Sequence, residues 1–181
     1  MRDTGVIRRI DELGRIVIPK EIRKTLRIRE GDPLEIYTEN GELIFKKYSP
    51  IANVKEIASG VCDSLYELTE KICFITDNDE VLYFSKNKNK EIIGSKNSSA
   101  LDKIIKERKS VVLSNKDGGE IKPLLCGEEI KMQNEIIIPI ISNGDAYGAL
   151  VMYDDNENES INENNIKLCR LSANIISKYF E

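Results

Sequence analysis

The most informative segment of the N-terminal part is Gly14-Arg15-Ile16-Val17-Ile18-Pro19-Lys20-Glu21-Ile22-Arg23-Lys24. Its β-branched run predicts a strand over residues 15–18. Pro19 then predicts a helix start, because its fixed φ suits the first helical position, and we expect the helix to cover residues 20–26. A second apolar run over residues 5–10 predicts another strand, separated from the first by a turn at residues 11–14.

Two further strands are predicted at residues 34–38 and 42–47, joined across Asn40-Gly41. Asn-Gly is the strongest local signal for a two-residue type I′ hairpin turn. A unit of about 50 residues rarely buries enough apolar surface to be stable alone, and this one contains no cysteine or metal-ligand cluster. We therefore expect residues 1–50 to form a homodimer in which two chains share one core.

Charge separates the start of the chain from the rest. The whole chain carries a net charge of −4, yet residues 1–29 hold nine arginines and lysines against four acidic residues. Seven of the nine arginines lie in this stretch. Arginine presents a planar fork of donors that suits phosphates and guanine edges, so this asymmetry indicates a nucleic-acid-binding module joined to a second domain.

The cations of this stretch define a candidate DNA-binding surface. At about 100° per residue, Ile22 and Leu26 share the inward face of the predicted helix, and Arg27 falls on the opposite arc with three other cations. Neutralising phosphates releases counterions, so binding should weaken steeply as salt rises. The candidate site residues, from this helix and the two preceding strands, are Arg8, Arg9, Arg15, Lys20, Arg23 and Lys24.

Residues 51–181 predict an α+β domain that begins after Pro50, with Asn53 as the N-cap of its first helix, which runs to residue 69. The closing helix, residues 161–180, has two apolar stripes, one with Leu171 and one with Ala173. Such a broad arc fits either deep burial in the core or contact with another subunit. The second possibility would make the protein a homotetramer. The remaining predicted elements are strands at 71–76, 81–85, 111–113, 135–142 and 146–153 and a helix at 98–108.

Several function classes are disfavoured. The chain has no histidine, which removes histidine-dependent triads, imidazole bases and histidine-ligated zinc. Its four isolated cysteines predict reduced, mostly buried thiols, and we expect no metal, no cofactor and no enzyme activity. The acidic pairs Glu128-Glu129 and Asp154-Asp155 are expected to be solvated surface. The longest apolar run, residues 136–141, is too short for a membrane span, and the start has no signal-peptide pattern, so a cytoplasmic protein is expected.

Residues 4–26, followed by Gly31-Asp32-Pro33, closely resemble the AbrB family of bacterial transition-state regulators. The resemblance implies a β-rich swapped-hairpin barrel, dimeric and with one short helix per chain, and it implies that Arg8, Arg15, Arg23 and Lys24 face double-stranded DNA. Lys24 stands where arginine is commoner in the family. A lysine keeps the charge but loses the bidentate fork, so a phosphate contact is expected there.

The second part resembles a GAF domain through residues 138–151. An AbrB-type domain followed by a GAF-like domain is similar to the regulators of sporulation genes in spore-forming Firmicutes. This implies a nucleoid-associated activator or repressor, acting in the forespore. Asn115-Lys116 opens the pattern of cyclic-nucleotide-binding GAF domains, but no phenylalanine follows before Phe180, so a ligand of this domain stays unknown. The alternative is an antitoxin, since swapped-hairpin domains also occur in toxin-neutralising proteins.

Overall fold

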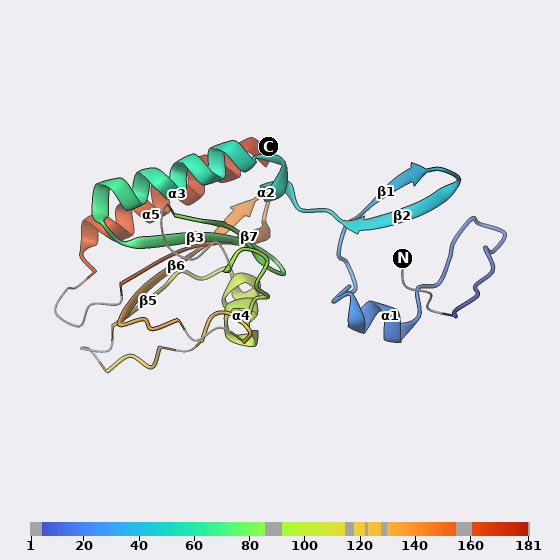
Figure 1. Ribbon diagram of the computed structural model, residues 1–181, viewed down its shortest axis with the longest axis horizontal. Coiled ribbons are helices and arrows are strands. Elements are labelled where there is room, and N and C mark those ends of the chain that lie inside the picture. Colours follow the sequence, from blue (N-terminus) through green and yellow to red (C-terminus); the bar gives the residue numbers. More distant parts are fainter. Residues whose placement is uncertain are drawn as a thin grey trace. The chain divides into compact units, whose positions relative to one another are not determined.

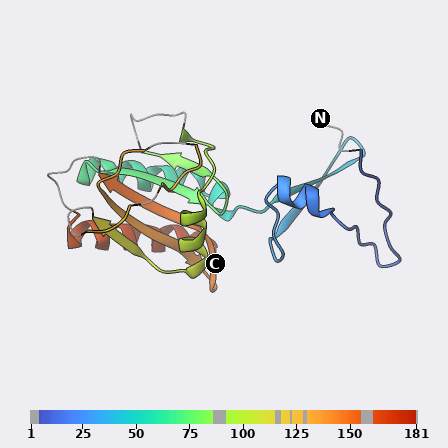
Figure 2. The ribbon, with the colours of Figure 1, turned by 90° about the horizontal axis from the view of Figure 1, so that it is seen from below.

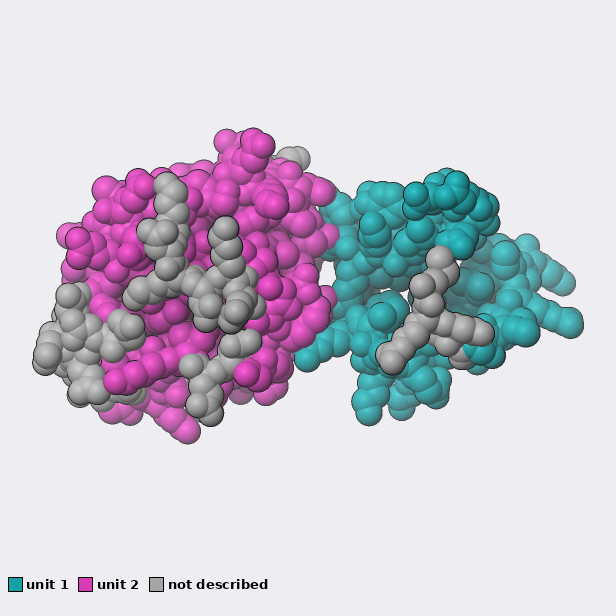
Figure 3. Space-filling model, viewed as in Figure 1, with its two compact units in different colours: residues 1–48 teal, residues 49–181 magenta. Residues whose placement is uncertain are grey.

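The computed structural model describes residues 5–85, 92–114, 118–121, 123–127, 130–154 and 161–180 (Figure 1). The chain divides into two compact units, residues 1–48, called the head, and residues 49–181, called the second unit (Figure 3). This division lies two residues before the predicted one. Pro50 and Ile51 are buried within the second unit, where they begin the short helix α2 (Pro50–Asn53).

The head contains one short helix and one two-stranded sheet. Helix α1 spans Lys20–Thr25, and strands β1 (Leu34–Glu39) and β2 (Glu42–Lys47) pair in antiparallel fashion. Asn40 and Gly41 both have positive φ, 48° and 82°, which confirms the predicted type I′ turn. The prediction that Arg27 continues the face of α1 is wrong, because the helix ends at Thr25 and Arg27 takes a left-handed φ of 52°.

The two strands predicted at residues 5–10 and 15–18 are not formed in the single chain. These segments run as irregular chain on either side of a turn at residues 11–14. A strand needs a hydrogen-bonding neighbour, and none pairs with them among the described residues of one chain. Their apolar side chains are correspondingly exposed, Ile7 by 87% and Val17 by 73%.

The second unit is built on a five-stranded antiparallel sheet in the order β4-β3-β7-β6-β5 (Figure 2). Strands β6 and β7 form a hairpin across Asn143-Gly144 at the middle of the sheet. The α+β architecture expected for residues 51–181 is therefore present. The strands are β3 (Ile72–Asp77), β4 (Val81–Phe84), β5 (Val111–Ser114), β6 (Asn134–Ser142) and β7 (Asp145–Asp154).

The two faces of this sheet are covered differently. Helices α3 (Lys55–Thr69) and α5 (Glu163–Ser177) pack on one face, and the 3-10 helix η3 (Lys178–Phe180) continues α5 (Figure 1). Helix α4 (Ser99–Glu107) packs on the other, together with loop residues such as Leu124. Alternate residues of β6 serve the two cores: Ile136 and Ile138 face the paired helices, and Ile137 faces α4.

The prediction that Asn53 caps the first helix of this unit is wrong. A helical turn already begins at Pro50, which fits the first helical position, and Val54 separates α2 from α3. Ile51 is fully buried against the sheet. The close approach depends on Gly148, since a Cβ there would lie 1.9 Å from the Thr76 carbonyl oxygen and 2.8 Å from Ile51 Cδ1.

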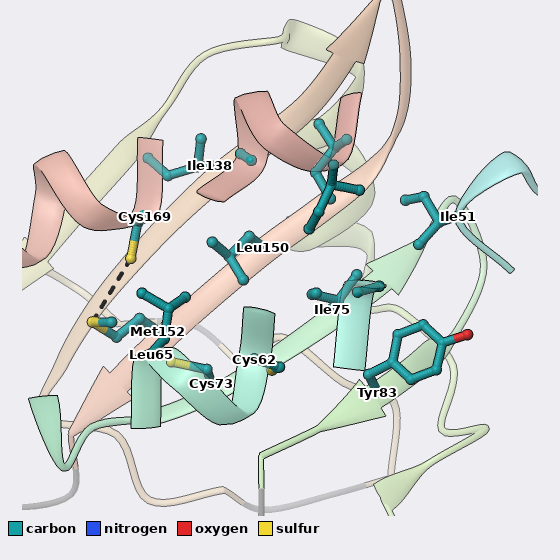
Figure 4. Close-up of a cluster of buried hydrophobic side chains, with 14 of the residues drawn as sticks. Ile51, Cys62, Leu65, Cys73, Ile75, Tyr83, Ile138, Leu150, Met152 and Cys169 are labelled. Carbon is teal, nitrogen blue, oxygen red and sulfur yellow. Dashed lines mark hydrogen bonds between the residues drawn. The ribbon is translucent and has the colours of Figure 1, made fainter. Parts of the chain in front are cut away.

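Cys62, Cys73 and Cys169 are free, buried thiols of the core between the sheet and α3 and α5 (Figure 4), and Cys126 is exposed. Burial raises the pKa of the Cys169 thiol to about 12, and its Sγ lies 3.7 Å from Met152 Sδ. These thiols are protonated and serve as packing residues. No helix in the described part of the chain combines the length and apolar character needed to cross a bilayer.

Candidate nucleic-acid interface

Helix α1 brings three of the predicted site residues together. Lys20, Arg23 and Lys24 are spaced three and four residues apart, which places them on one helical face, and all three are exposed. Buried Pro19 anchors the start of the helix, where its carbonyl oxygen accepts a hydrogen bond from the Arg23 N–H at 2.9 Å. Arg23 and Lys24 lie in the last turn, where a positive charge is favoured by the helix dipole.

Arg15 lies at the end of the turn that follows residues 5–10. Its Nε donates a hydrogen bond of 2.8 Å to Asp11 Oδ2, and its backbone N–H donates to Asp11 Oδ1, also at 2.8 Å. Arg15 remains 71% exposed despite this ion pair. Asp11 was expected only as a turn residue. The signal for its second role is the spacing Asp-x-x-Gly-Arg, since an aspartate side chain readily bonds the backbone of its own turn.

Arg8 and Arg9 precede this turn, and both are exposed. Arg8 Nη1 donates a hydrogen bond of 3.1 Å to the carbonyl oxygen of the adjacent Ile7. The described residues supply no ion-pair partner for five of the six predicted site residues. This concentration of uncompensated positive charge on one small unit fits a polyanionic partner. The five residues are Arg8, Arg9, Lys20, Arg23 and Lys24.

The second unit contains a buried carboxyl group, Glu135, that the sequence analysis did not single out. Glu135 of β6 is 1% exposed, and its Oε2 has no hydrogen-bond partner. Burial raises the pKa of Glu135 to about 7. Its side chain belongs to the face shared with Ile137 and α4, opposite Tyr153 of β7. The sequence did not indicate its burial, because a glutamate near the end of a predicted strand is usually exposed.

Other sequence features give no site in the described residues. No group of three or more Cys, Asp or Glu side chains comes together there in a way that could hold a metal ion. Asn115, Lys116 and the pair Glu128-Glu129 lie outside the described residues, as does Asp155. Asp154 itself is buried and forms an ion pair with Lys71, so the expectation that it lies on a solvated surface is wrong.

Comparison with known proteins decides the family. Residues 53–181 match the family model described as "Stage V sporulation protein T C-terminal, transcription factor". Stage V sporulation protein T of Bacillus subtilis (strain 168) is 38% identical over 182 residues, which cover 100% of this chain and 99% of that protein. The chain belongs to the stage V sporulation protein T family. It is thus a member of a family of sporulation transcription factors.

Two further comparisons bear on the separate units of this family member. The transition state regulatory protein AbrB of Bacillus subtilis (strain 168) is 56% identical over 50 residues, 28% of this chain and 52% of that protein. The GAF domain from Acinetobacter phosphoenolpyruvate-protein phosphotransferase matches with a TM-score of 0.56 at 14% identity, covering 71% of this chain and 87% of that one. The predicted fold class, an AbrB-type domain followed by a GAF-like α+β domain, is confirmed.

The antitoxin alternative rests on a shorter match. Residues 7–53 match the family model described as "Antidote-toxin recognition MazE, bacterial antitoxin". That match ends at residue 53, within the first helical turn of the second unit, whereas the sporulation protein matches both units. A transcription factor is therefore the better supported function.

Proposed function

We propose that this protein regulates sporulation genes by binding double-stranded DNA through its head. The observation that carries the proposal is the set of exposed cations without ion-pair partners in the described residues of the head. A DNA backbone supplies the missing negative charge, and arginine can add contacts to base edges. The proposed contact residues are Arg8, Arg9, Arg15, Lys20, Arg23 and Lys24.

Two heads form the proposed DNA-binding body. Among the described residues, twelve of the eighteen exposed large hydrophobic side chains lie in the head, including Ile16, Ile36 and Phe45. Apolar surface on this scale is stable only when something covers it. A second copy that pairs residues 5–10 and 15–18 with its own strands would cover it and complete a swapped-hairpin barrel.

The second unit is proposed to join two such dimers into a homotetramer. One stripe of α5 is buried in the core, with Ala173 and Ile176, whereas Leu171, Ile175 and Tyr179 are 58%, 41% and 58% exposed. The exposure of these apolar side chains supports the subunit contact over deep burial. This unit also has the fold of a sensor, with an unknown ligand, and the relationship to transcription factors supports regulation rather than catalysis.

The proposed place of action follows from the proposed partner. A regulator of sporulation genes acts where the chromosome lies, so we place the protein in the cytoplasm on the nucleoid, and in the forespore during sporulation. Binding at different promoter positions would make it an activator at some genes and a repressor at others.

Three alanine variants test the DNA contacts: Arg8→Ala, Arg15→Ala and Arg23→Ala. Each should weaken binding about tenfold or more. The fall of log affinity with log salt concentration should also become less steep, because fewer counterions are released. Gel shifts across a salt series measure both quantities on promoter DNA. Arg170→Ala, an exposed arginine of the second unit, is the matched control. Affinity like that of the wild type in all three variants would refute the proposal.

A further inference from the structure

The turn at residues 11–14 is held together by one side chain. The Asp11 carboxylate accepts the backbone N–H groups of Leu13 at 3.0 Å and Arg15 at 2.8 Å through Oδ1. The backbones of Asp11 and Arg15 close the same turn, because the Asp11 N–H donates to the Arg15 carbonyl oxygen at 3.0 Å. Gly14 completes it with a φ of +74°, a conformation that favours glycine.

The second oxygen of the same carboxylate has a different function. Asp11 Oδ2 accepts a hydrogen bond of 2.8 Å from Arg15 Nε. Of the three nitrogens of the guanidinium, Nε is the one nearest the backbone, so this bond fixes the direction of the side chain. Within the described part of the chain, the two terminal Nη nitrogens of Arg15 make no hydrogen bond, and the side chain is 71% exposed. The fork that recognises a phosphate or a guanine edge is therefore held ready at the tip of the turn.

We infer that Asp11 is a positioning residue for DNA binding, which orients Arg15 for the phosphate backbone or base edge it contacts. The inference rests on the proposed function, in which Arg15 touches DNA. Its physical basis is preorganisation: an arginine whose rotamers are already restricted loses less entropy when it binds. The backbone N–H and then the guanidinium of Arg15 lower the pKa of Asp11, so the carboxylate is charged throughout the neutral range.

Simple electrostatics predicts the opposite effect of removing Asp11. A carboxylate near a DNA-binding surface repels the phosphates, so its neutralisation alone should strengthen binding. Glu12 provides the matched case, since it lies on the same turn, is exposed, and makes no side-chain hydrogen bond or ion pair among the described residues. Glu12→Gln and Asp11→Asn remove the same charge one residue apart. Only the second breaks the bond to Arg15 Nε.

The test compares full-length variants on a duplex fragment recovered from genomic DNA by the wild-type protein, with affinity measured by fluorescence anisotropy. In Asp11→Asn, the amide oxygen can still accept the two backbone N–H groups, so the turn is kept, while the amide nitrogen cannot accept from Nε. We expect Asp11→Asn to weaken binding about three- to tenfold. Glu12→Gln should leave the affinity unchanged or raise it.

A double-mutant cycle separates positioning from a purely structural role. If Asp11 acts through Arg15, Asp11→Asn should cause no further loss of affinity in an Arg15→Ala background. Arg15→Lys gives a second measurement, because lysine keeps the charge but has no Nε–H in that position, and it should lose nearly as much affinity as Arg15→Ala.

Two results would overturn the inference: tighter binding by Asp11→Asn, as expected for Glu12→Gln, or a loss that persists unchanged in the Arg15→Ala background. A full affinity in Arg15→Ala would instead refute the Arg15 contact itself. If Asp11→Asn does not fold, as judged by its thermal transition, the Arg15→Lys variant decides alone, and an affinity equal to the wild type would contradict positioning.

Discussion

The two hairpins of this chain share their turn chemistry and differ in everything around it. β1 and β2 meet at Asn40-Gly41 and β6 and β7 at Asn143-Gly144, with both turn residues at positive φ in each case. The first hairpin makes a two-stranded sheet by itself and leaves Ile36 59% exposed, whereas the second is the centre of a five-stranded sheet. A good turn therefore fixes local pairing, and the surroundings decide whether a core forms.

The same contrast holds for the two units. Apart from Pro19, every buried apolar side chain of the described residues lies at Pro50 or beyond. The second unit covers both faces of its sheet with its own helices and loops, so it has the properties of a domain that folds alone. The head has strand-forming segments and apolar side chains without a partner. In the proposed dimer of heads, folding of the head is coupled to association, so its stability should depend on protein concentration.

Ile16→Asp should have a large effect on the head, because it places a carboxylate in the core that two heads are proposed to share. Ile16 is 45% exposed in one chain and would be buried in the swapped barrel, where an unpaired carboxylate costs on the order of 4 kcal/mol or more. Calorimetry should show the loss of the head transition and an unchanged second-unit transition, and light scattering should show a smaller assembly. Ile93→Asp, at 48% exposure in the second unit, is the control and should change neither. An intact head transition in Ile16→Asp would contradict the shared core.

Glu135→Gln tests whether one buried carboxyl group sets the pH dependence of the second unit's free energy of unfolding. The carboxyl pKa is raised from its ordinary value of 4.5 to about 7, so the folded state binds the proton more tightly than the unfolded state. The contribution of Glu135 to stability is therefore fully present below about pH 4.5 and is lost as pH rises from about 4.5 to 7, by about 3 kcal/mol in all.

The glutamine variant should lack this fall. Urea unfolding of the second unit should show the variant close to the wild type at about pH 5 and more stable than it by about 3 kcal/mol at about pH 8. Glu56→Gln, at an exposed position of α3, is the control and should keep the pH dependence of the wild type. An identical pH profile for Glu135→Gln would show that Glu135 does not titrate in this range. The head transition should not move in either variant.

Leu171→Asp should have the smallest effect, because it acts on the proposed contact between second units and leaves each unit folded. Leu171 is 58% exposed, so its own core loses little. A charged residue in a helix–helix contact should weaken association by about 2 kcal/mol per chain. Light scattering over a concentration series should show dimers held by the head, with the affinity for a short DNA fragment retained. A stable tetramer in this variant would remove α5 from the interface.

Much of the fold could be predicted from local chemistry. Pro19 marked the start of α1, and Ser98, which the prediction placed at the start of the next helix, caps α4 with its side-chain oxygen on the Leu101 N–H. The apolar runs of β6 and β7 gave a hairpin with ends within one residue. These features depend on contacts only a few residues apart in sequence, which is why pattern and capping signals locate them.

The errors share a different cause. The segments 5–10 and 15–18 are strand-like in sequence but need hydrogen-bond partners from outside one chain. Asn53 was a good capping residue, yet burial of Ile51 against Gly148 started the helix earlier. Arg27 leaves the helical face because its backbone is left-handed, and no glycine in the sequence indicated this conformation. In each case long-range packing or a rare backbone conformation overrode a local preference.

Sequence patterns were enough to predict a cationic head too small to bury its apolar residues, joined to a larger α+β unit. They could do so because charge, turn residues and apolar periodicity are properties of neighbouring positions. The structure adds that Asp11 accepts a hydrogen bond from Arg15, that the buried Glu135 has a carboxylate oxygen without a hydrogen-bond partner, and that Leu171 and Ile175 of α5 are exposed. The bond from Arg15 to Asp11 is local and depends on the conformation of the turn at residues 11–14. The burial of Glu135 and the exposure of Leu171 depend on which distant residues meet in space, and packing of the whole second unit sets this.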